Sequence, residues 1–115
     1  MDKNSVEDWL KTYGVENYTI NKDLSVDVIG DVNLWSKGLL EIPVKFESVS
    51  GDFSCNNNRL STLLGCPDSV GRNFFCNDNC LVSLIGCPEF VGGDFYCMFN
   101  SLNDSDEFLY SCSNS

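Results

Sequence analysis

Apolar residues recur along this chain at a fixed interval, and that repetition is the clearest feature of the sequence. Two consecutive segments of 21 residues read VSGDFSCNNNRLSTLLGCPDS, over Val49–Ser69, and VGRNFFCNDNCLVSLIGCPEF, over Val70–Phe90. A third copy begins as VGGDFYCMFNSL, over Val91–Leu102, and then departs from the pattern. Because a fixed period of about 20 to 50 residues is typical of stacked structural units, we expect a solenoid.

Each copy carries the pattern Phe-x-Cys-x-x-Asn-x-Leu-x-x-Leu, which predicts the course of one coil. The Phe and Cys alternate with a polar residue, so they share one face of a short strand, and successive strands stack in parallel. The Asn amide is expected to bond backbone groups of its own and neighbouring coils where the chain turns inward. Gly-Cys-Pro predicts a return bend, and no helical pattern fits on the return side. The residues of the pattern are Phe53, Cys55, Asn58, Leu60 and Leu63, then Phe74, Cys76, Asn79, Leu81 and Leu84, then Phe95, Cys97, Asn100 and Leu102.

The residues before the repeats predict a cap for the open end of the solenoid, which terminal coils require. Ser5–Asp8 resembles a capping box with Ser5 as the N-cap. One apolar helix face follows, and Gly14 is expected to end the helix. Two short alternating segments, 18–20 and 24–28, predict a hairpin or a first irregular coil. The helix face consists of Val6, Trp9, Leu10 and Tyr13.

The whole chain, 1–115, is interpreted as a single domain: a helix and hairpin cap over 1–28, repeats over 29–102, and a C-terminal cap or tail over 103–115. Val32 and Leu34 stand at the Phe and Cys places of a degenerate first repeat, with Lys37 in place of the Asn. This first repeat, 29–48, reads as one residue short. Phe108 or Tyr110 could fold back over the last coil, which would otherwise expose a strand edge.

The pattern resembles the leucine-rich repeat, with the match at Phe53, Cys55, Asn58 and Leu60 and at the same places of the next copies. Gly-Asp-Phe-x-Cys-x-x-Asn-x-Leu followed by Gly-Cys-Pro-x-x-Val-Gly is similar to short repeat proteins common in tailed-phage and prophage genomes. This resemblance covers about residues 5–102 and implies a phage-encoded cytoplasmic protein. We therefore expect a leucine-rich-repeat-like β-solenoid with short parallel strands, few or no repeat helices and an N-terminal α-helical cap, in the α/β class by convention.

The charge of the chain narrows the choice of partners. Seventeen acidic and seven basic residues give a formal net charge of −10. This argues against direct nucleic-acid binding, which needs a basic face, and against docking on anionic lipid. The sequence contains no run of about 18 apolar residues, the length that a helix needs to span a membrane. The polar start, Met1–Asp8, is unlike a signal peptide, so we expect a cytoplasmic protein, in the host cytoplasm if it is phage-encoded.

Seven cysteines suggest a disulfide or zinc framework until the period is considered. Five of them occupy two repeated places and are expected to be small core hydrophobes with reduced thiols. Cys76-x-x-x-Cys80 is the only candidate zinc pair. The chain has no His, no catalytic triad and no phosphate loop, and Cys80 lacks a visible base. We expect no enzyme, no cofactor and no metal site. The repeated cysteines are Cys55, Cys76 and Cys97, then Cys66 and Cys87.

Outward-facing positions can be compared from coil to coil because the strands stack. Exposed aromatic and Met side chains grouped on such a face mark an interaction surface, and a column of Asp could steer a basic partner. Two alternatives stay open: the C-terminal segment could cover the aromatic residues, and the Asp column, which Asn73 interrupts, could serve turn bonding or bind calcium. The candidate partner-binding residues are Trp35, Phe75, Tyr96, Met98, Phe99, Asp31, Asp52 and Asp94.

These features together favour a non-enzymatic protein-binding module. The resemblance to phage repeat proteins sharpens this to a protein that modulates or inhibits a host protein, such as a component of a defence system, with a basic surface on the partner. The alternative is an acidic nucleic-acid mimic that blocks a DNA-binding protein or nuclease. Self-association through a terminal strand or the aromatic patch is a further arrangement.

Overall fold

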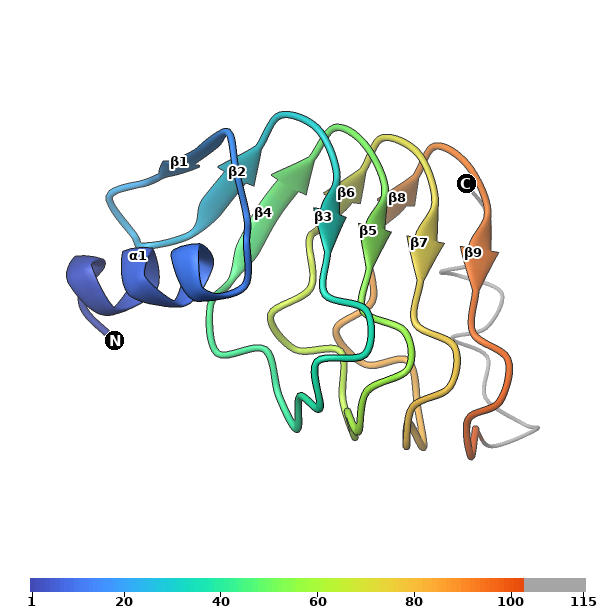
Figure 1. Ribbon diagram of the computed structural model, residues 1–115. Helices are drawn as coiled ribbons and strands as arrows, with labels where there is room; N and C mark the ends of the chain where they lie inside the picture. Colours follow the sequence, from blue (N-terminus) through green and yellow to red (C-terminus); the bar gives the residue numbers. More distant parts are fainter. Residues whose placement is uncertain (103–115) are drawn as a thin grey trace.

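The computed structural model describes residues 1–102, and the expected C-terminal cover over 103–115 lies outside the described residues. The chain forms a parallel-strand β-solenoid of about three turns with one N-terminal helix, which confirms the predicted fold class. Figure 1 shows the coils following one another from the helix at one end toward the last described coil at the other.

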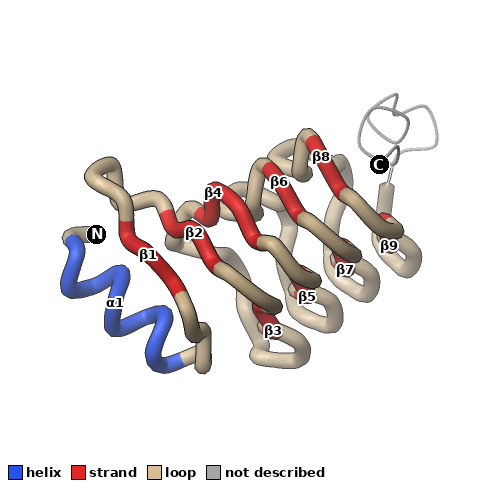
Figure 2. Tube along the Cα trace, turned by 90° about the horizontal axis from the view of Figure 1, so that it is seen from above, coloured by secondary structure: helices blue, strands red, loops and turns tan. Residues whose placement is uncertain are grey.

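Two parallel rows of short strands run along the solenoid, as Figure 2 shows from above. Within the first row, β1 and β2 form the predicted antiparallel hairpin, and the later strands pair in parallel. The first row consists of β1 (Tyr18–Ile20), β2 (Val26–Val28), β4 (Phe46–Val49), β6 (Ser69–Val70) and β8 (Phe90–Val91). The second row consists of β3 (Val32–Asn33), β5 (Phe53–Ser54), β7 (Phe74–Phe75) and β9 (Phe95–Tyr96).

The strand register shows where the repeats begin. Val28 pairs with Val49, and Val49 pairs with Val70, a constant step of 21 residues. The first coil is therefore full length, whereas the sequence pattern indicated a repeat one residue short. The irregularity lies earlier, between Val26 and Asp27, where the register against β4 shifts.

The N-terminal helix α1 spans Lys3–Thr12 and covers the first end of the solenoid (Figure 1). The prediction of Ser5 as N-cap was wrong, because Asp2 takes this place and its Oδ1 accepts a hydrogen bond of 2.9 Å from the Ser5 backbone N–H. The hydrogen bonds from Ser5 lower the pKa of Asp2. Gly14, at φ 74°, follows the helix end as predicted. The buried helix residues are Val6 and Leu10, with Trp9 and Tyr13 packed against the core.

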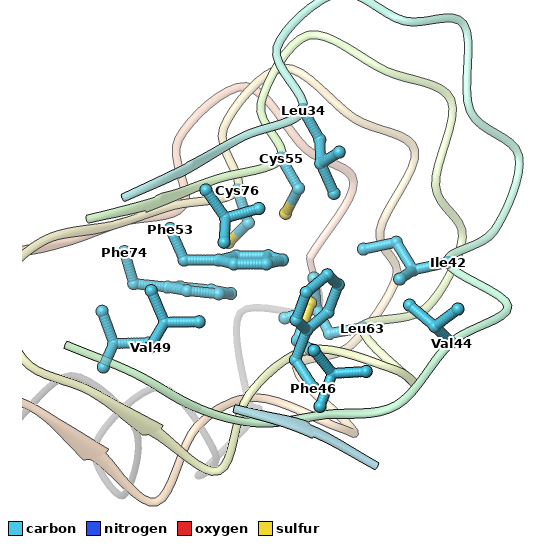
Figure 3. Close-up of a cluster of buried hydrophobic side chains, with 14 of the residues drawn as sticks. Leu34, Ile42, Val44, Phe46, Val49, Phe53, Cys55, Leu63, Phe74 and Cys76 are labelled. Carbon is cyan, nitrogen blue, oxygen red and sulfur yellow. The ribbon is translucent and has the colours of Figure 1, made fainter. Parts of the chain in front are cut away.

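A continuous core runs between the two rows of strands. The rings of Phe53 and Phe74 stack at 5.9 Å, and Phe46 and Phe95 extend this line of rings in both directions. Figure 3 shows Cys55 and other small side chains filling the space beside the rings. The core therefore follows the predicted Phe-x-Cys pattern. The free thiols among the described residues are those of Cys55, Cys66, Cys76, Cys80 and Cys97. The expectation of reduced thiols was wrong for Cys87, which is disulfide-bonded.

One asparagine per coil satisfies backbone groups in the turn after the second row, as predicted. Asn58 Oδ1 accepts the N–H groups of Lys37 and Leu39 at 3.0 and 2.9 Å. Its Nδ2 donates to the carbonyls of Leu34 and Cys55 at 2.8 and 3.0 Å. Asn79 and Asn100 repeat this arrangement in the next coils. These bonds join each coil to the one before it.

Candidate protein-binding face

Four candidate residues lie together on the outer side of β7 and β9 and the turn that follows β9. We call Phe75, Tyr96, Met98 and Phe99 the aromatic face. The rings of Phe75 and Tyr96 stack with centroids 4.8 Å apart and an interplanar angle of 3°. The Tyr96 hydroxyl donates to Asp94 Oδ2 at 3.1 Å, and this bond, with the charge of Asp94, raises the pKa of Tyr96.

Met98 and Phe99 extend the aromatic face into solvent, at 53% and 73% exposed. Phe99 has a positive φ of 59°, at a turn place that Ser36, Asn57 and Asp78 fill in the earlier coils at 53°, 61° and 56°. Short polar residues tolerate this left-handed conformation, whereas a bulky residue there is a genuine outlier that costs on the order of 1–3 kcal/mol. Phe99 thus combines backbone strain with an apolar side chain left in water.

The predicted Asp column forms a hydrogen-bond ladder along the edge of the second row. Asp31 Oδ1 accepts the backbone N–H of Asp52 at 2.7 Å, and Asp52 Oδ1 accepts that of Asn73 at 2.9 Å. Asn73 Oδ1 continues the ladder to the N–H of Asp94 at 2.8 Å. These bonds run from each coil to the next, 21 residues on, and not within one turn as turn bonding implies. The same bond explains why Asn73 can replace an Asp. Within residues 1–102, no group of three or more His, Cys, Asp or Glu could hold a metal ion.

Trp35 does not join the aromatic face. It is 54% exposed in the first coil. The backbone N–H of Ser36 donates to Asn56 in the next coil, and that of Asn57 donates to Asn77 in the coil after it. Asn56 and Asn77 therefore lie between Trp35 and Met98. The eight candidates therefore divide into the aromatic face, the Asp ladder that borders it, and Trp35 near the far end of the same side.

A second exposed apolar strip was missed by the sequence analysis. We call Leu40, Leu64, Val82 and Ile85 the return-bend ridge, and they are 53% to 63% exposed. Leu40 and Val82 stand 42 residues apart and Leu64 and Ile85 stand 21 apart, so they follow the same period. This spacing is a signal that the sequence contains. It was missed because outward positions were compared only on the strand side and not on the return side.

The first row of strands carries a second row of acids: Glu47 lies in β4, and Asp68 and Glu89 directly precede β6 and β8. Backbone bonds of 3.0 and 2.8 Å join the three residues from coil to coil. The Asp68 carboxylate raises the pKa of Glu47, and desolvation adds to the shift. Lys45 Nζ lies 2.8 Å from Asp68 Oδ1 and partly offsets the repulsion. This row was not recognised from the sequence, because its residues alternate between Asp and Glu outside the core pattern.

Cys80, the candidate nucleophile, is exposed and free, in the coil that contains Asn79. No helix in the described part of the chain is long and apolar enough to cross a membrane. Comparisons with protein-family models, with curated proteins and with solved structures find no match. The class of the protein therefore rests on its fold, which is that of a β-solenoid repeat protein with a spacing of about 21 residues.

Proposed function

We propose that this chain is a non-enzymatic protein-binding module that docks through its aromatic face. The observation that carries the proposal is Phe99, a strained and exposed phenylalanine in the turn that follows β9, in the same coil as Tyr96 of the stacked pair. Backbone strain concentrates at functional sites, and grouped aromatic and Met side chains supply contact area at protein interfaces. A partner that buries Phe99 would recover free energy that the isolated chain forgoes.

The Asp ladder adds a preference for a basic partner. Asp31 and Asp52 use Oδ1 for the backbone bond to the next coil, and Asp94 Oδ2 accepts the Tyr96 hydroxyl, so all three carboxylates remain at the rim of the aromatic face. Rim charges mainly steer association and select partners. With the resemblance to phage repeat proteins, we take the partner to be a cytoplasmic host protein whose activity the chain modulates or inhibits, such as a component of a defence system.

The experiment is an affinity pull-down from bacterial lysate, read by mass spectrometry at low and high salt. The double variant Phe75→Ser/Tyr96→Ser should lose a host protein that the wild type retains. The matched control Leu64→Ser/Ile85→Ser removes two exposed apolar side chains from the return-bend ridge and should retain that protein. Loss in the control with retention in the aromatic variant, both folded by circular dichroism, would place binding on the ridge and contradict the proposal.

An acidic nucleic-acid mimic is the second candidate function. The two acidic rows, one at each row of strands, with the Glu47 carboxylate near that of Asp68, favour it. A mimic would occupy the basic groove of a nuclease or another DNA-binding protein. Its binding should weaken steeply as salt rises and should fall on neutralising Glu47 and Glu89. Binding that is insensitive to salt would exclude the mimic.

A further inference from the structure

The stack of Phe75 and Tyr96 on the aromatic face has no third ring in the preceding coil, where Ser54 stands. Because the strands pair in parallel, Phe75 lies between Tyr96 of the next coil and Ser54 of the preceding coil. The rings of Phe75 and Tyr96 are almost parallel, so Tyr96 covers one face of the Phe75 ring. Ser54 has only a hydroxymethyl group, which is too short to cover the opposite face. The stack therefore leaves room for one more planar group above Ser54.

A carboxylate stands beside this place. Asp52 directly precedes β5 and stands two residues before Ser54, so the alternation of extended backbone puts both side chains on the side opposite the buried Phe53. Asp52 Oδ1 accepts the N–H of Asn73 at 2.9 Å, which fixes the carboxylate next to the Phe75 coil. Asp52 has no ion pair within residues 1–102, where the one salt bridge joins Lys45 and Asp68. A planar group above Ser54 would therefore meet an uncompensated negative charge.

An open aromatic face beside a fixed carboxylate matches the chemistry of one side chain. A guanidinium is planar, stacks on aromatic rings and offers a fork of N–H donors to a carboxylate. A lysine ammonium provides the charge without the planar face, and a neutral ring provides the face without the charge.

We propose that the step between Ser54 and Phe75, together with Asp52, is a subsite for an arginine side chain of the partner protein. This inference rests on the proposed function and adds the chemistry of the partner. The guanidinium would continue the stack of Phe75 and Tyr96 by one coil spacing, about 4.8 Å, and pair with the Asp52 carboxylate.

The test uses the full chain labelled with nitrogen-15 and three peptide probes at equal ionic strength. The probes are acetyl-Gly-Arg-Gly-amide and its Lys and Phe counterparts, followed by the amide shifts of Ser54 and Phe75. We expect saturable shifts with the arginine probe and an affinity about threefold higher than for the lysine probe, the size of an exposed cation–π contact. Equal affinities for arginine and lysine, or tighter binding of the Phe probe, would overturn the assignment.

Two variants separate the subsite from general attraction to an acidic protein. Ser54→Phe fills the step without changing the charge and should abolish the shifts at Phe75. Asp52→Asn keeps the backbone bond, as Asn73 does naturally, and should weaken arginine binding by about threefold or more. Glu41→Gln removes one charge from the exposed return bend and should leave the affinity unchanged. Equal loss in Asp52→Asn and Glu41→Gln would show nonspecific attraction and overturn the proposal.

The same variants distinguish this inference from the proposed function. A host protein that is lost on Phe75→Ser/Tyr96→Ser but retained in full by Asp52→Asn and Ser54→Phe would preserve the protein-binding proposal and overturn the arginine subsite. Arginine binding at Ser54 and Phe75 without any captured host protein would preserve the arginine subsite and overturn the protein-binding proposal.

Discussion

One turn position in each coil shows how a single side chain affects both the stability of the chain and its exposed apolar surface. This position directly precedes the asparagine position, which Lys37 fills in the first coil. Ser36, Asn57 and Asp78 occupy this place in successive coils, each with a positive φ. Asn and Asp reach this conformation at low cost because their short polar side chains bond locally, and Asn57 Nδ2 donates to Ser36 Oγ at 2.6 Å. Phe99 stands at the same place without such compensation.

Replacing Phe99 with Asn should therefore stabilise the isolated chain. The strain of a bulky residue in the left-handed region would be relieved, by about 1 kcal/mol in the free energy of unfolding. Little apolar burial would be lost, because Phe99 is 73% exposed. The same substitution should weaken binding to the partner. Urea unfolding followed by circular dichroism measures the first effect, and the pull-down measures the second.

Met98→Asn is the matched control, since Met98 is an exposed apolar neighbour without a positive φ. It should change the free energy of unfolding by less than about 0.5 kcal/mol. If Phe99→Asn is no more stable than Met98→Asn, the strain at Phe99 does not govern stability.

At the scale of secondary-structure elements, predictability depended on length and periodicity. The helix and the hairpin were foreseeable because Val6, Leu10 and the segment 24–28 carry recognisable periods. The strands β6 and β8 were not, because they lack the Phe-x-Cys alternation that marks β5, β7 and β9, and each has a single buried residue. Their pairing depends instead on burial of Val70 and Val91 against the core, which only the stacked coils create.

The candidate site was predictable to a similar extent. The repeat brought Phe75 and Tyr96 into one column from spacing alone, and the stack confirms their contact. Neither the strain at Phe99 nor the place of Asp52 beside Ser54 could be read from the sequence. Both depend on backbone angles and on which carboxylate oxygen the neighbouring coil uses.

The edge of the first row provides a test by pH. The Asp68 carboxylate raises the pKa of Glu47 in the folded state. A raised carboxyl pKa means that stability is fully present below the unfolded pKa, near 4.5, and is lost as pH rises through the folded pKa. At pH 7 both groups are charged and repel. Glu47→Gln should therefore raise the melting temperature at pH 7 and have little effect at pH 3.

Thermal melts of wild type and Glu47→Gln across pH 3 to 7 measure this difference. Glu41→Gln removes an equal charge from the return bend and reports the effect of net charge alone. A gain for Glu41→Gln as large as that for Glu47→Gln would mean that the overall charge of −10, and not the contact with Asp68, is responsible.

The whole molecule behaves as a stack in which each coil contacts its neighbours. Stability in such a solenoid is approximately a sum of coil terms and interfaces between adjacent coils. The bonds that join coils have equivalents one period later. Cys55 N donates to Phe75 O as Cys76 N donates to Tyr96 O, and Asn79 Oδ1 accepts from Leu60 N as Asn58 Oδ1 accepts from Leu39 N. One complete period should therefore be removable.

Deletion of 49–69 provides the test, because it joins Ser48 to Val70 and keeps the phase. Val28 would then pair with Val70, and Phe74 would lie against Val32. We expect a folded chain with a lower melting temperature and a urea m-value reduced by about a fifth, as 21 of 115 residues are lost. The aromatic face remains, whereas Asp52 and Ser54 are lost, so the deletion should still capture the partner but more weakly than the wild type. Deletion of 60–69, which breaks the phase, should unfold the chain; equal unfolding by both deletions would show that the coils are not interchangeable units.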